Sequence, residues 1–112
     1  MNLSNITLDK GVKLQNQGDD LGARNIFRQL LKNGEDNVEL LNRYAVTCMN
    51  MGDYDDAIES CLRSLVLAPD LIDTNINVGL AYYQSGDIRE FKKFIQKSME
   101  LAPDREDIKD LW

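Results

Sequence analysis

Apolar residues recur at helical spacing along most of this chain, in pairs of segments separated by short polar turns. One segment places four of them at i, i+3, i+4 and i+7: Leu41, Tyr44, Ala45 and Cys48. This spacing puts them on one face of a helix. After the turn signal Gly52-Asp53, residues 54–65 repeat the helical pattern. The pattern therefore predicts two amphipathic helices joined by a tight turn.

The same arrangement recurs along the chain. Gly-Asp pairs begin at Gly18, Gly52 and Gly86, which gives a period of 34 residues, and the only two prolines, Pro69 and Pro103, also stand one period apart. A fixed period of this length indicates stacked supersecondary units. It divides the chain into repeats at residues 4–37, 38–71 and 72–105, followed by a short segment at 106–112.

Each repeat is expected to fold as helix, turn and helix. The glycine can adopt the left-handed conformation that ends the first helix, and the following Asp can accept a hydrogen bond from the start of the second. Each helix should be about 14 residues long, or roughly 20 Å.

Small residues recur where two such helices would face each other. The position seven residues before the turn glycine holds Gly11, Ala45 and Gly79, which allows close approach of the paired helices. The position five residues after it is small in two repeats and holds Phe91 in the third. We expect Phe91 to be accommodated by Gly79 opposite, or by a shift of the third hairpin.

With these residues in register, the chain resembles the tetratricopeptide repeat family. The matching residues are clearest in the second repeat: Tyr44-Ala45, Gly52-Asp53-Tyr54, Ala57-Ile58 and Pro69. The resemblance covers nearly the whole chain and implies an all-α fold, a right-handed superhelical solenoid of three helix-turn-helix hairpins. Residues 106–112 should add a capping helix of two turns that lays Ile108, Leu111 and Trp112 on the last hairpin.

Composition narrows the function further. A net charge of −6 argues against nucleic acid as a partner, because such binding depends on clustered cations. No run approaches the ~20 apolar residues of a membrane span, and the polar start is unlike a signal peptide, so we expect a cytoplasmic protein. Cys48 and Cys61, with no histidine in the chain, cannot supply the usual four zinc ligands. We expect buried, reduced thiols, no metal and no cofactor.

No catalytic constellation is visible. The chain has no His base and no Gly-rich phosphate loop, and neither Cys has a basic neighbour in sequence. We therefore expect no enzyme but a protein-protein interaction module with a partner of unknown identity. In the tetratricopeptide family the first helix of each hairpin lines a concave groove that commonly holds a peptide. The matching positions carry apolar side chains beside amides: Val12, Asn16, Asn42, Val46, Met49, Asn50, Ile76, Leu80, Tyr83 and Gln84, with Leu8 and Gln15 completing the rows.

Some family members hold acidic chaperone tails through Lys, Arg and Asn in this groove. The matching positions here are Leu8, Val12, Arg43, Asp73 and Asn77. Only Arg43 could bind a carboxylate, and Asp73 would repel one. We therefore expect no binding of a chaperone tail.

Other interpretations stay open at this stage. Binding could use the convex face or the ends of the array, and copies could self-associate through those ends. Four cations gather on one predicted helix: Arg89, Lys92, Lys93 and Lys97. They form either a solvated face or a docking stripe for an acidic partner or membrane surface. The chain could also be the accessory domain of a larger glycosyl- or methyltransferase.

Overall fold

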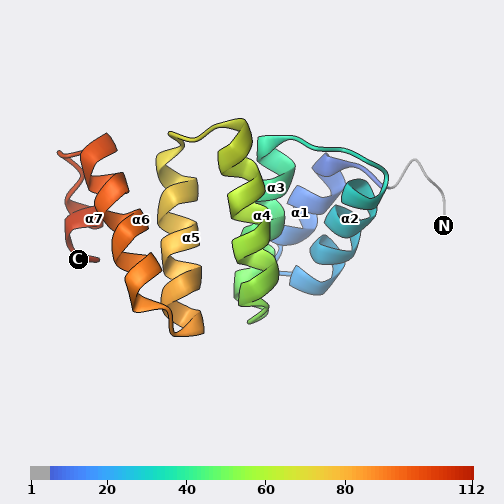
Figure 1. The fold of residues 1–112 in the computed structure, drawn as a ribbon. Helices are drawn as coiled ribbons and strands as arrows, with labels where there is room; N and C mark the ends of the chain where they lie inside the picture. The colour runs from blue at the N-terminus through green and yellow to red at the C-terminus, as the bar shows by residue number, and fades with distance from the viewer. Residues whose placement is uncertain (1–5) are drawn as a thin grey trace.

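The computed structural model describes residues 6–112, so Ser4 and Asn5 of the first predicted repeat lie outside the described residues. Seven helices follow one another: α1 (Leu8–Asn16), α2 (Asp20–Lys32), α3 (Val38–Asn50), α4 (Tyr54–Leu67), α5 (Ile72–Ser85), α6 (Ile88–Leu101) and α7 (Glu106–Lys109). They form three antiparallel hairpins, α1–α2, α3–α4 and α5–α6, with α7 against α6 (Figure 1). Successive hairpins stack into an elongated array measuring 45 × 24 × 21 Å.

All three hairpin turns are built in the same way. The turn glycines Gly18, Gly52 and Gly86 have φ of 82°, 80° and 95°, a conformation that costs glycine little. In each turn the N–H of the following Asp reaches back to the preceding helix, at 2.8–2.9 Å: Asp19 to Leu14 O, Asp53 to Cys48 O and Asp87 to Tyr82 O. This closure satisfies carbonyls that the helix end would otherwise leave free.

The second helices start differently from one another. Gly22 N–H donates to Asp19 Oδ1 at 2.9 Å, as expected of a capping Asp. Asp53, at the equivalent position, makes no capping bond and instead forms an ion pair with Arg24 of α2. The expected cap is therefore wrong at Asp53. In the next repeat the residue equivalent to Arg24 is Ile58, so Asp87 has no matching cation. Asp87 instead caps α6 by accepting a hydrogen bond from Glu90 N–H at 3.2 Å.

The first repeat departs from the other two at both ends. Its α1 has 9 residues, well short of the predicted length, whereas α2 to α6 have 13 or 14. The turn after α2 uses Gly34, with φ of 88°, where the later repeats have proline one position further on. Glu35 N–H then reaches Leu30 O at 3.2 Å. A left-handed glycine thus replaces proline as the helix terminator.

Glycine permits close packing inside two hairpins. A Cβ built on Gly11 would lie 2.4 Å from the Phe27 ring, and one on Gly79 would lie 3.1 Å from Ile95 Cδ1. The atoms nearest to Gly79 therefore belong to Ile95 and Phe94, and not to Phe91 as expected. Phe91 packs instead against Tyr83, with ring centroids 5.0 Å apart.

Most of the buried apolar residues between residues 6 and 112 fall into two clusters. The main core runs from the first hairpin through α5 and contains Phe27, Leu40 and Val78. The second cluster contains Phe91, Ile95 and Ile108 and joins α7 to the last hairpin.

The capping segment is only partly as predicted. Its helix, α7, has 4 residues and not two turns. Ile108 is buried and Leu111 packs half-buried against the second cluster, but Trp112 is 58% exposed, so two of the three predicted side chains cover the last hairpin. None of the helices between residues 8 and 109 is both long enough and apolar enough to cross a membrane.

Candidate functional site

The first helices of the three hairpins form one layer, because α3 contacts both α1 and α5. Side-chain bonds join them. Gln15 Nε2 donates to Thr47 Oγ1 at 2.9 Å and to Arg43 O at 3.1 Å, and Thr74 Oγ1 donates to Asn42 Oδ1 at 3.0 Å. We call the surface of α1, α3 and α5 that carries the predicted binding residues the first-helix face. On this face Gln15 and Asn42 tie the hairpins together.

Most of the predicted apolar residues on this face also have structural contacts. Leu8, Val12 and Met49 pack against the main core, and Ile76 and Leu80 pack against the second cluster. These half-buried side chains contribute to hairpin packing and present only part of their surface outward.

The remaining predicted residues are the most accessible part of the face. Asn16, Asn50 and Gln84 are exposed, Tyr83 is 51% exposed above Phe91, and half-buried Val46 belongs to neither cluster of described residues. Asn50 Nδ2 makes one long bond to Asp20 Oδ1, at 3.4 Å. The accessible residues thus combine amides with two apolar side chains, and none carries a charge.

Two charged neighbours of this face, Arg43 and Asp73, have partners. Arg43 Nη1 lies 3.5 Å from Gln15 Oε1. Asp73 pairs with Arg105 at 3.2 Å. Arg105 also binds Asp107, with Nη2 and Oδ2 2.6 Å apart, and this contact lowers the pKa of the Asp107 carboxyl. Among the five positions that match the chaperone-tail clamp, Arg43 is the single basic side chain.

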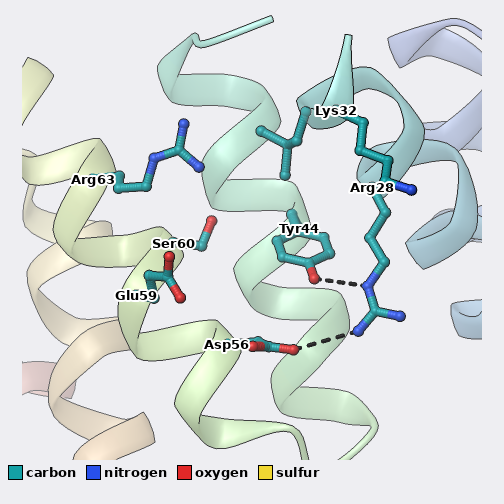
Figure 2. A pocket seen from close by; sticks show the side chains of 8 residues that line it. Arg28, Lys32, Tyr44, Asp56, Glu59, Ser60 and Arg63 are labelled. Carbon is teal, nitrogen blue, oxygen red and sulfur yellow. Dashed lines mark hydrogen bonds and ion pairs between the residues drawn. The ribbon is translucent and has the colours of Figure 1, made fainter. Parts of the chain in front are cut away.

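A hollow of about 330 Å³ lies between α2 and α4. It is lined by Arg28, Leu31, Lys32, Tyr44, Asp56, Glu59, Ser60 and Arg63, with Tyr44 of α3 at its floor (Figure 2). Arg28 Nε donates to the Tyr44 hydroxyl at 2.9 Å and Nη2 reaches Asp56 at 3.4 Å. Burial raises the pKa of Tyr44, against the opposing effect of the Arg28 bond.

Sequence reasoning did not identify this hollow. A signal was available, since cations at Arg28 and Lys32 in one repeat are followed by acids at Asp56 and Glu59 in the next. Arg63 pairs in the same way with Asp36, at 3.1 Å. Such half-exposed pairs stabilise little individually, and their main effect is to fix how the first two hairpins meet.

Both cysteines are buried and neither forms a disulfide. Burial raises the pKa of the Cys48 thiol and that of Cys61 to about 12. Because the thiolate is the reactive form, neither cysteine suits a nucleophile.

The repeat residues and their geometry agree with a known family. The family model of the tetratricopeptide repeat matches residues 38–71, and a second tetratricopeptide repeat model matches residues 72–105. The chain belongs to the tetratricopeptide repeat family. A comparison with curated proteins finds no match.

Several solved structures share this tetratricopeptide fold. MamA from Desulfovibrio magneticus RS-1 superposes with a TM-score of 0.86 at 22% identity, over 90% of this chain and 57% of that one. The first tetratricopeptide domain of Spaghetti (RPAP3), bound to HSP90 peptide SRMEEVD, gives 0.82 at 19% identity, over 92% and 85%. An O-GlcNAc transferase mutant from Thermobaculum terrenum gives 0.79 at 24% identity, over 90% and 19%. The chain thus spans little more than half of the MamA chain.

Proposed function

We propose that this protein is an interaction module whose first-helix face binds a segment of a partner protein. The observation that carries the proposal is the chemistry of the accessible side chains on that face: Asn16, Val46, Asn50, Tyr83 and Gln84. They are uncharged in a chain of which 29% of residues are charged. These amides and apolar groups suit a guest that is itself uncharged where it contacts them.

The residues divide the work of binding. Amide side chains can donate to carbonyls and accept from N–H groups of a guest main chain. Val46 and Tyr83 supply apolar area, and Tyr83 rests on Phe91, which limits the rotamer freedom it would lose on binding. The bonds from Gln15 to Thr47 and from Thr74 to Asn42 hold the three helices in place before a guest arrives.

Related domains that share the fold include ones solved with acidic peptides, such as the HSP90 peptide on RPAP3 and the HSP70 peptide SGPTIEEVD on the second tetratricopeptide domain of human RPAP3. We do not extend that ligand to this chain. Its clamp positions offer Arg43 as the single cation, and Asp73 adds a negative charge. The proposed guest is an uncharged segment with apolar side chains.

The test starts from random peptides displayed on phage and selected on the wild-type domain. The best peptide, made synthetically, is then titrated by fluorescence anisotropy against the double variant Val46→Asp/Tyr83→Asp. We expect at least a ten-fold loss of affinity, about 1.4 kcal/mol, because two carboxylates would be desolvated in the interface. Leu21→Asp is the matched control, since Leu21 is also exposed and the equivalent position in the second repeat is natively Asp55. Unchanged binding by the double variant, with normal circular dichroism, would place the site elsewhere.

A second candidate function is that of an accessory domain in a larger enzyme. The T. terrenum transferase supports it, because the matched part is 19% of that chain. Reading the complete gene tests this candidate: a transferase domain in the same reading frame would favour it, and a frame that contains this domain alone would reject it.

Self-association through the ends of the array is tested by light scattering. A mass that rises with concentration, and that Trp112→Ala lowers, would support it, since Trp112 is exposed.

A further inference from the structure

The second repeat exposes apolar side chains along the outer side of α4. Val66 is 83% exposed, Leu67 49% and Leu62 37%. The positions of Leu62 and Val66 hold Arg28 and Lys32 in the first repeat and Gln96 and Glu100 in the third, whereas Leu67 recurs as Leu101. Large exposed apolar groups that lie together are informative in a way that single ones are not. The apolar ridge of Leu62 and Val66 is therefore specific to α4, because the repeat itself does not require apolar residues at these two positions.

Repeat equivalence places a row of lysines on the side of α6 next to this ridge. On α4, Glu59 and Arg63 lie on the side that faces the preceding second helix, α2, and line the hollow there. One period later on α6, the equivalent residues are Lys93 and Lys97, which should lie on the side of α6 that faces α4. Lys97 Nζ donates to Pro69 O at 2.9 Å, only three residues after Val66, which shows that α6 approaches the end of α4. We call Leu62, Val66, Lys93 and Lys97 with their surroundings the α4–α6 face.

On the α4–α6 face, no ion pair joins the two helices among the described residues, in contrast to α2 and α4. Arg28 of α2 pairs with Asp56 of α4. The residue of α4 equivalent to Arg28 is Leu62, which cannot form such a pair with α6. Within α6, Lys93 lies 3.9 Å from Glu90. Lys97 lies 3.9 Å from Asp70, which follows the end of α4. Both are long contacts.

The helix α6 is also basic as a whole. Arg89 and Lys92 bring it to four cations, against the acids Glu90 and Glu100. Among the described residues, Arg89 and Lys92 form no ion pair. In a chain with a net charge of −6, α6 is a local basic stripe beside an apolar one.

We propose that the α4–α6 face is a second docking surface, and that it binds an acidic amphipathic helix of a partner protein. The apolar side of that helix would cover Leu62 and Val66, and its carboxylates would meet Lys93 and the outer cations of α6. Apolar burial supplies affinity, and opposite charge sets orientation and speeds encounter. This surface is separate from the first-helix face, so one chain could hold two partner segments together.

The test uses a variant in which the first-helix face is disabled. Random peptides of about 15 residues, or four helical turns, are displayed on phage and selected on the Val46→Asp/Tyr83→Asp variant. We expect enriched peptides with net negative charge and apolar residues at i, i+3 or i+4 and i+7. The best of them, made synthetically, should lose at least ten-fold in affinity to Val66→Asp and to Lys93→Glu. It should also weaken as salt rises from about 0.1 M to about 1 M.

Matched controls separate the surface from general charge effects. Lys32→Asp places the same carboxylate at the equivalent position of the first repeat, and Lys10→Glu repeats the charge change on exposed α1; both should retain binding. Circular dichroism confirms folding of each variant. No enriched peptide, enriched basic peptides, or binding unaffected by Val66→Asp and Lys93→Glu would overturn the proposal.

Two other occupants would also overturn it. Sedimentation with vesicles of phosphatidylserine and phosphatidylcholine that Lys93→Glu abolishes, in the absence of peptide binding, would assign the face to a membrane surface. A dimer mass in light scattering that Val66→Asp converts to monomer would assign it to a second copy of this chain.

Discussion

Gly11 and Gly79 occupy equivalent positions in the first and third hairpins, yet alanine should destabilise the protein only at Gly11. A Cβ on Gly11 would lie 2.4 Å and 2.9 Å from two atoms of the Phe27 ring, whereas one on Gly79 would meet Ile95 Cδ1 at 3.1 Å. Phe27 is a rigid ring with no exposed surface. Ile95 is also buried, but the atom in contact is the free end of a side chain that can rotate.

The magnitudes follow from two opposing terms. Replacing Gly by Ala inside a helix stabilises it by about 1 kcal/mol. Overpacking a core costs about 1–3 kcal/mol, and the Gly11 contact lies at the upper end because the ring must move by about 1 Å to restore an ordinary contact. We therefore expect Gly11→Ala to lower the free energy of unfolding by about 1–2 kcal/mol. Gly79→Ala should leave it unchanged or raise it by up to about 1 kcal/mol.

Urea unfolding followed by far-ultraviolet circular dichroism measures both changes, with equal slopes required for the comparison. The double variant Gly11→Ala/Phe27→Leu supplies a control. It removes the ring that the new methyl group meets, so its loss should be smaller than the sum of the two single losses, with a coupling of about 1 kcal/mol. The reasoning fails if Gly11→Ala is as stable as the wild type, or if the double variant is simply additive.

Three further predictions concern the ion pair, the thiols and the ligand. Asp53→Ala should lower the free energy of unfolding by about 1–2 kcal/mol, because it leaves the largely buried Arg24 without its ion-pair partner. Asp87→Ala should lower it by about 1 kcal/mol, because Asp87 only caps α6. Urea unfolding measures both losses, and equal losses would contradict this. Cys61 should resist a thiol reagent at about pH 8, because its thiol is buried and protonated. Its pKa in the folded protein, about 12, exceeds the usual 9.0. The buried thiol should therefore contribute stability that is present below about pH 9 and lost as pH rises towards 12. Reaction at the rate of a free thiol would contradict its burial. The peptide SRMEEVD should show no saturable binding by calorimetry, and micromolar binding would refute the clamp argument.

The helices and turns could be predicted because their signals are local. Glycines such as Gly52 end helices through their own backbone freedom, and apolar spacing within one helix selects the buried face. The first repeat was less predictable. Its α1 begins with a Thr7 cap, several residues later than the period implies, and Gly34 ends α2 where the later repeats have proline one position further on.

Contacts between repeats could not be read in the same way. Asp53 was predicted as a cap, but a cation 29 residues earlier captures it. Gln15 and Asn42 looked like binding amides, but they bond to the neighbouring hairpins. Such choices depend on which side chains face each other after stacking. They are visible in the sequence only when equivalent positions are compared, as Arg24 with Ile58.

The central claim is that the accessible side chains of α1, α3 and α5 recognise the partner. Nuclear magnetic resonance tests it most directly, by titrating the isotope-labelled wild-type domain with its best phage-selected peptide. The account predicts that the largest amide shifts fall at Asn16, Val46, Asn50, Tyr83 and Gln84, with smaller changes on α2 and α6. Shifts confined to the second helices, with the first-helix face unchanged, would contradict it.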